Sequence, residues 1–180
     1  MSTPPAPVEG DPRAELLVKT ILECLCTTLA EAGRAVCCCT WIRRDRTLMP
    51  QACDCSCGGG QGVAWVRIAE RRYDRQVTRS TGFNGKNCGV RFVEEWTVEI
   101  GVARCWPEGE NGMSCETELE AAADGAWDED LLMQALLCCE PLEKYSIVPT
   151  VTRTLGPQGG CIASYATVTV QPGTRPRGYG

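Results

Sequence analysis

The residues most capable of chemistry are concentrated between positions 35 and 62. Six of the 14 cysteines fall within the twenty-one residues from 37 to 57. Structural zinc sites need four ligands, usually in two short cysteine pairs separated by a longer loop. Cys37 and Cys39 form a Cys-x-Cys pair, and Cys53 and Cys57 form a Cys-x3-Cys pair thirteen residues further on. This pattern is close to a zinc site but lacks the usual two-residue spacing, and any such site would be all-cysteine because the chain has no histidine.

Disulfides are a second interpretation of the same stretch. Alternate residues of a strand share a face, so Cys37 and Cys39 can each meet a cysteine across the loop 40–52. The disulfide candidates in the chain are Cys37, Cys39, Cys53, Cys55, Cys57, Cys105 and Cys161. With 14 cysteines the connectivity cannot be deduced. The third and favoured interpretation is that most cysteines are free thiols, buried as small apolar side chains in a reducing cytosol.

Catalytic signals are weak throughout the chain. The absence of histidine removes the commonest general base, and no Cys-x-x-Cys redox pair occurs. The glycine-rich segment 58–62 lacks the lysine and hydroxyl residue of a phosphate-binding loop. Glu94, Glu95 and Glu99 place charge on both faces of one strand, which indicates solvated edges or subunit contacts. We therefore expect a protein that is not an enzyme and that needs no cofactor.

An amphipathic helix is predicted to begin at Pro12 and to run for about twenty residues. Asp11 is placed to cap its first turn, and Gly33 to end it. Its apolar positions recur with a period of 3.6 residues. They are Leu16, Leu17, Ile21, Cys24, Leu25, Thr28 and Leu29. Cys24 lies on this stripe and is expected to be a small buried hydrophobic residue.

Strands are predicted on both sides of a turn-rich loop at 78–89. Residues 35–42 form a strand or an extended linker, and a strand follows the glycines at 58–62. Residues 90–106 give the strongest strand, because Phe92, Trp96, Val98 and Ile100 form one apolar face. Two closing strands flank the Gly-Pro-Gln-Gly-Gly turn at 156–160.

A second helical region is predicted after a turn at 107–112. Apolar residues recur at helical spacing, and Gly125 is a possible break. These positions are Leu119, Ala122, Ala123, Trp127, Leu131, Leu132, Ala135, Leu136 and Cys139.

The order of elements predicts an α+β domain with a mainly antiparallel sheet and two helical regions packed on one face. We expect one domain over residues 13–172, a flexible proline-rich arm over 1–12 and a mobile tail over 173–180. The net charge of −5 and pI of about 4.9 disfavour a protein that grips nucleic-acid phosphates. No run is apolar enough for a membrane span or a signal peptide, so we expect no membrane association.

Four segments in this order resemble tail terminator proteins of long-tailed (siphovirus) phages that infect actinobacteria. They are the strand at 61–66, the strand at 98–105, the helix end at 131–139 and the turn at 156–161, and the resemblance covers about residues 14–170. The chain departs from the family pattern at 162–167 and in the cysteine triple 37–39. A metal or disulfide role for that triple is therefore not part of what the resemblance implies.

The resemblance implies a structural virion protein at the head-tail interface, assembled in the host cytoplasm. Tail terminators form a hexameric ring that caps the tail tube protein, ends its polymerisation and joins it to a head-side connector or stopper protein. Genomic DNA passes through the ring without sequence-specific binding, and an acidic lumen would favour that passage. The expected contacts are exposed apolar residues on the charged strand and the two chain ends, 1–12 and 171–180.

Two alternatives remain open at this level. One is another neck protein of the head-tail junction, a connector or stopper, which shares size and symmetry with a terminator. The other is a small all-cysteine zinc-binding interaction module in the host cytoplasm, which metal content distinguishes because structural zinc contributes to folding.

Overall fold

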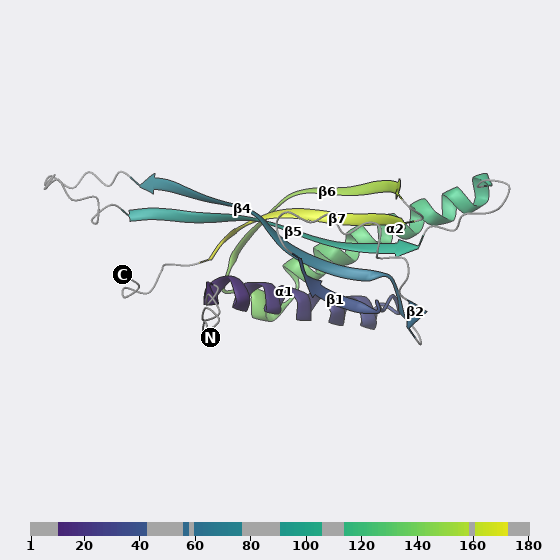
Figure 1. Ribbon diagram of the computed structural model, residues 1–180, viewed down its shortest axis with the longest axis horizontal. Coiled ribbons are helices and arrows are strands. Elements are labelled where there is room, and N and C mark those ends of the chain that lie inside the picture. Colours follow the sequence, from purple (N-terminus) through teal and green to yellow (C-terminus); the bar gives the residue numbers. More distant parts are fainter. Residues whose placement is uncertain are drawn as a thin grey trace, which may run out of the picture.

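The computed structural model describes residues 11–42, 56–57, 60–76, 91–105, 114–158 and 161–172 (Figure 1). The predicted arm, the loop at 78–89, the turn at 107–112 and the predicted tail lie outside these residues, except for Asp11 and Pro12. Within them, a five-stranded sheet has the order β1-β4-β5-β7-β6, and two helices pack against it. The strands are β1 (Cys38–Trp41), β4 (Val63–Gln76), β5 (Arg91–Cys105), β6 (Ser146–Gln158) and β7 (Cys161–Gln171). The predicted α+β class is confirmed.

The sheet is antiparallel except at one edge, where β1 pairs with β4 in parallel. The segment predicted as a strand or linker at 35–42 therefore contains the edge strand β1. A second, two-stranded sheet joins β2 (Ser56–Cys57) to β3 (Gly60–Gln61).

Helix α1 (Pro12–Glu31) begins and ends where local signals predict. The Asp11 carboxylate accepts a hydrogen bond from the Arg13 amide at 3.1 Å, and Pro12 occupies the first turn. The chain leaves the helix at Ala32, and Gly33 adopts a φ of +71°, a conformation that glycine tolerates best. The predicted stripe is buried except at Thr28, which is half-buried, and Leu16, which is 53% exposed. That position was wrongly assigned to the core because it lies at the edge of the stripe.

Helix α2 (Cys115–Leu137) runs without a break through Gly125, contrary to the possible break there. Its C-terminal half is buried as predicted through Leu131, Leu132, Ala135 and Leu136. Its N-terminal half is not: Leu119 is 71% exposed and Trp127 is 49% exposed. The prediction of a core-facing stripe along the whole helix is therefore wrong, because the N-terminal half of the helix lies toward the end of the sheet (Figure 1). A short 3-10 helix, η3 (Glu140–Leu142), follows.

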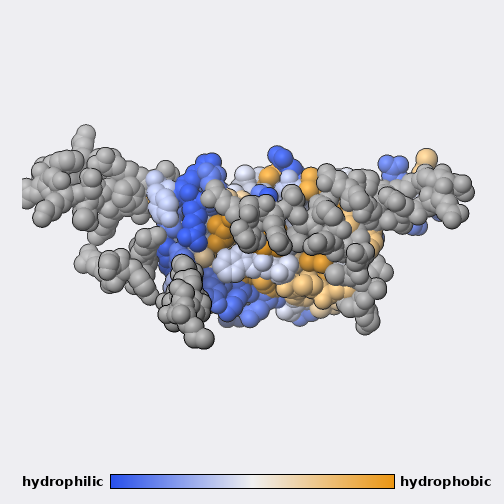
Figure 2. All heavy atoms as spheres, viewed as in Figure 1, coloured by the Kyte–Doolittle hydropathy of each residue, from blue (hydrophilic) through white to orange (hydrophobic). Residues whose placement is uncertain are grey.

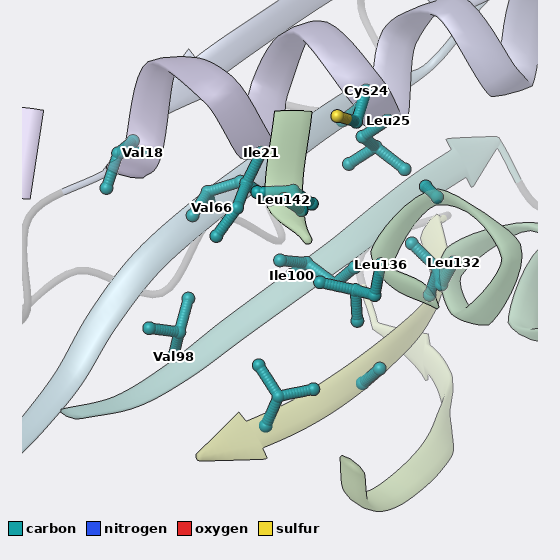
Figure 3. Packing of buried hydrophobic residues seen from close by; sticks show 14 of the residues in the cluster. Val18, Ile21, Cys24, Leu25, Val66, Val98, Ile100, Leu132, Leu136 and Leu142 are labelled. Atoms are coloured by element: carbon teal, nitrogen blue, oxygen red, sulfur yellow. The ribbon is translucent and has the colours of Figure 1, made fainter. Parts of the chain in front are cut away.

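The core lies between the two helices and one face of the sheet (Figure 3). Alternate residues of β5 enter it, and Trp96, Val98 and Ile100 are fully buried. The predicted apolar face of this strand is confirmed for these three residues; the side chain of Phe92 lies outside the described ones. In Figure 3, Ile21 and Leu25 of α1 and Leu136 of α2 point into the same core cluster as Val66, Val98 and Ile100 of the sheet. Among the described helices, none is long and apolar enough to cross a membrane.

Candidate functional site

Two disulfides fasten α1 to distant parts of the chain. Cys24 pairs with Cys139, 115 residues away, and Cys26 pairs with Cys39 of β1. The Cα atoms are 6.0 and 6.6 Å apart, within the usual range for a disulfide. Opposite sides of one turn of α1 are thus joined to the segment that follows α2 and to the edge strand.

The predicted disulfide candidates fall into three groups. Cys37, Cys39 and Cys161 are disulfide-bonded. Cys105 is exposed and lies opposite Cys161 in the register of β5 and β7. Cys53 and Cys55 lie outside the described residues, as does the side chain of Cys57. The sequence did not indicate Cys24, Cys26 or Cys139 as disulfide partners, because a cysteine on a helical stripe looks like any small core residue.

The zinc interpretation needs Cys37 and Cys39 as thiolates. Both are disulfide-bonded, and Cys39 has Cys26 as its partner, so neither is a zinc ligand in this state. Across the described residues, no group of three or more potential ligands is positioned for a metal ion. Cys53 lies outside that part of the chain.

The interpretation of most cysteines as buried free thiols does not agree with the described residues. Cys24 is buried, as predicted, but it is disulfide-bonded. Cys38, Cys115 and Cys138 are outside disulfides and are exposed. Among the described cysteines, the buried ones, Cys24 and Cys161, are both disulfide-bonded, whereas the disulfide-bonded Cys39 is exposed.

Removal of the Cys24–Cys139 disulfide is expected to lower the free energy of unfolding by about 2–4 kcal/mol, because a disulfide that closes a long loop restricts the unfolded chain. The measurement is urea unfolding of Cys24→Ala/Cys139→Ala against wild type without reductant. Cys38→Ser, which changes an exposed thiol, is the control and should leave the midpoint unchanged. Equal midpoints for wild type and the double variant would show that this bond does not stabilise the fold.

A charged cluster surrounds Trp96 at the N-terminal end of α1. The Glu94 carboxylate accepts hydrogen bonds from Trp96 Nε1 and from Arg13, both at 2.8 Å. The guanidinium groups of Arg13 and Arg71 lie 5.4 and 4.4 Å from the centre of the Trp96 ring. Asp11 binds both arginines, at 3.0 and 3.1 Å. The cap of α1 is thereby joined to β4 and β5, and the expectation that Glu94 is a solvated edge residue is wrong.

The ionisation of Glu94 is coupled to folding. Burial raises its pKa, but hydrogen bonds from Trp96 and Arg13 and the charge of Arg13 outweigh burial and hold the pKa below its ordinary value of 4.5. A carboxyl group with a lowered folded pKa contributes stability that is present above the unfolded pKa and is lost as the pH falls through the folded pKa.

Glu94→Gln is therefore expected to be less stable than wild type above pH 4.5, with a difference that shrinks as the pH is lowered below that value. The glutamine preserves the shape of the side chain and removes its charge. Denaturant titrations from pH 7 to pH 3 measure the effect, with Glu143→Gln as a control on an exposed glutamate. A difference that stays constant over this range would contradict the coupling.

A second cluster, the Asp128 cluster, joins α2 to β5 and to the end of α1. The Asp128 side chain is 4% exposed. It accepts hydrogen bonds from Arg34 Nε at 2.8 Å and from Arg104 Nε and Nη2 at 2.6 and 3.0 Å. Arg104 also donates to the Arg34 carbonyl oxygen at 3.1 Å. One carboxylate thus holds two guanidinium groups from separate parts of the chain. The sequence did not indicate these three residues, because 94 residues separate Arg34 from Asp128.

Arg34 is held further by residues of α2. Its Nη1 donates to Asp124 at 2.8 Å, and its guanidinium stacks over Trp127 at 4.9 Å. Burial lowers the pKa of Arg34, but the bonds to Asp128 and Asp124 outweigh burial and raise it above its ordinary value. The arginine therefore remains charged and serves as a fixed cross-link.

A cavity of about 150 Å³ adjoins the Asp128 cluster, between the N-terminal half of α2 and the ends of β5 and β7. Its lining includes Arg104, Glu120, Asp124 and Ser164. Two charged residues of this lining are bound by other side chains: Arg104 donates to Asp128, and Asp124 accepts from Arg34. Ser164 Oγ likewise donates to the Gly125 carbonyl oxygen at 3.1 Å. These bonds fix α2 on the sheet.

The helix-free face of the sheet carries a second buried apolar cluster, made of Val63, Ala103, Cys161 and Ala163, and next to it a polar part. Thr97, Glu99 and Thr167 lie there, and Glu99 forms an ion pair with Arg67. Trp65 and Tyr165 flank Gly101 in the register, with ring centres 6.4 Å apart. A Cβ atom at Gly101 would lie 2.5 Å from the Trp65 ring, so only glycine allows the indole to lie flat on the strand.

Exposed apolar residues occur at both ends of the long axis, as well as at Leu16, Trp41 and Val148 elsewhere on the described surface. Strands β4 and β5 extend past the helices at one end, and the N-terminal half of α2 extends at the other (Figure 1). Tyr73 on β4 is 50% exposed, and Leu119 and Trp127 lie exposed on α2. Figure 2 shows hydrophilic residues gathered where β4 and β5 leave the core.

Comparison of the sequence with models of known protein families and with curated proteins gives no match.

Proposed function

We propose that this protein is a structural component of a phage virion, a tail terminator that forms a ring on the tail tube. The observation that carries the proposal is the extension of β4–β5 and α2 from a small core at opposite ends, with Tyr73 exposed on β4 and Leu119 and Trp127 exposed on α2. Exposed apolar side chains of this size commonly mark interaction surfaces. Ends that differ in structure suit a head-to-tail contact, which closes into a ring when the rotation between copies allows it.

The charged clusters support a structural role. The buried carboxylates Glu94 and Asp128 bind arginine side chains, and these ion pairs join helices to strands. A subunit that bears load in a particle needs its helices fixed on its sheet, and the two disulfides of α1 serve the same end. The net charge of −5 agrees with a channel through which DNA slides.

The test combines solution mass with binding. A tail terminator is expected to give a particle of six chains of 19.5 kDa by light scattering, unchanged by a chelator. Added to polymerising tail tube protein of the same phage, it should bind tube ends and shorten the tubes seen by electron microscopy. A chain that stays monomeric at all concentrations and does not bind tubes would refute the proposal.

Two outcomes would point to the alternatives. Binding to the head-side connector without binding to tail tubes would indicate a different neck protein. A monomer that contains about one zinc per chain and unfolds on chelation would indicate the zinc-binding module.

A further inference from the structure

The outer face of α2 carries an apolar stripe that no described residue covers. Leu119, Ala122, Ala123 and Ala126 are exposed at helical spacing, and Leu137 continues the stripe at 55% exposure. The opposite face of the same helix bears Gly125, Asp128 and Leu132 against the sheet. The helix therefore has two apolar faces, of which the described residues bury only one.

Acidic residues surround this outer stripe. Residues 115–130 contain seven aspartates and glutamates and no lysine or arginine. Asp124 and Asp128 are bound to Arg34, and Glu129 accepts a hydrogen bond from Thr154 at 2.6 Å. Glu116, Glu118 and Asp130 are exposed beside the stripe. The surface thus suits an occupant that is apolar and basic.

The segment 75–91 of this chain has that composition. It carries Arg75, Arg79, Lys86 and Arg91, no acidic residue, and the apolar residues Val77, Phe83 and Val90. It includes the last two residues of β4 and the first of β5. Just before this segment, Arg71 binds Asp11 and Arg72 binds Glu70, so acidic side chains already balance their charges. The four basic residues of segment 75–91 have no acidic residue within the segment to balance them.

The strand ends that lead into segment 75–91 and the outer stripe of α2 lie far apart in one molecule. The described ends of β4 and β5 lie at one end of the long axis, and the N-terminal half of α2 lies at the other (Figure 1). A contact between them therefore joins two copies. Because the two surfaces differ, the contact is heterologous and each copy retains one free surface of each kind, as a ring requires.

We infer that the outer stripe of α2, with Glu116, Glu118 and Asp130, is the docking site for segment 75–91 of a second copy of this chain. The inference deepens the proposed function, since it names the contact between neighbouring subunits of the ring, and it rests on that proposal. Opposite charges fix the register and speed the encounter, and the apolar stripe supplies the buried area.

Two charge-reversed variants of the full chain test the contact. Glu116→Arg/Asp130→Arg gives the three exposed acidic positions beside the stripe a net positive charge, and Arg75→Glu/Arg79→Glu/Lys86→Glu makes the segment acidic, because only Arg91 then remains basic in it. Each variant alone is expected to associate at least about a hundred-fold more weakly than wild type in sedimentation analysis, because like charges then face each other. An equimolar mixture is expected to recover the wild-type assembly, because every contact in an alternating ring again joins opposite charges.

Glu140→Arg/Glu143→Arg is the matched control, since it reverses two exposed acids outside α2 and should assemble as wild type. Circular dichroism of each variant checks that the fold is kept. Full assembly of either test variant alone, or no recovery in the mixture of two folded variants, would overturn the docking site while leaving the ring proposal intact. A wild-type chain that never assembles would also overturn the docking site. The proposed function is refuted by a separate result, namely that this wild-type chain does not bind tail tubes either.

Discussion

Replacing Asp128 with alanine is expected to lower the free energy of unfolding by about 3–5 kcal/mol. The carboxylate is nearly inaccessible and is held by both Arg34 and Arg104. Without it, two guanidinium groups stay in a largely buried site, where the exposed carboxylate of Asp124 binds Arg34. An unfolding titration in urea measures the loss.

Asp124→Ala provides the graded control for this prediction. Its side chain is 62% exposed and binds the same Arg34, so its removal is expected to cost less than about 1 kcal/mol. The triple replacement Arg34→Met/Arg104→Met/Asp128→Leu removes every charge of the cluster and should recover much of the loss, as apolar replacements of buried ion pairs do. A loss below about 1 kcal/mol for Asp128→Ala would show that the cluster does not stabilise the fold.

Replacing Trp96 with alanine is expected to cost about 3–5 kcal/mol of stability. The ring is fully buried in the core, and the guanidinium groups of Arg13 and Arg71 lie against it. The alanine leaves a large cavity and removes the donor that holds Glu94. Chemical denaturation with a far-ultraviolet probe measures the change, since the substitution alters fluorescence.

Two further variants separate the contributions of Trp96. Trp96→Phe retains an aromatic ring but removes the Nε1 donor and part of the indole volume, so about 1–2 kcal/mol is expected to be lost. Trp41→Ala changes a tryptophan that is 46% exposed on the edge strand and should cost less than Trp96→Phe. Equal losses for the alanine variants of Trp41 and Trp96 would contradict the role of Trp96 as a core residue.

Local patterns predicted the elements of the fold well where one short segment decided the outcome. Asp11 and Pro12 set the start of α1, and Gly33 set its end, because capping and backbone conformation depend on a few adjacent residues. Alternation placed Trp96, Val98 and Ile100 on the buried face of β5 for the same reason. Helical spacing also gave α2, but it could not tell which of two apolar faces the domain buries.

The candidate sites were much harder to predict. Cys24 pairs with Cys139 over a separation of 115 residues, and nothing near either cysteine identifies the other. Arg34, Arg104 and Asp128 are ordinary charged residues along the chain and become a cluster only through the packing of α2 on β5. Glu94 looked solvated because its burial depends on Arg13, which α1 brings to it from 81 residues away.

The sequence by itself determined the α+β class, the start of α1, the buried face of β5 and the opposite charges of residues 75–91 and 115–130. These follow from hydrophobic period, capping and charge, which short segments carry on their own. Only the tertiary structure decided the disulfide pairs, the two arginine clusters and the exposure of the outer α2 stripe. Each depends on residues far apart in the chain that meet when the helices pack on the sheet, and that packing also places the acidic helix face and the ends of β4 and β5 at opposite ends of the molecule.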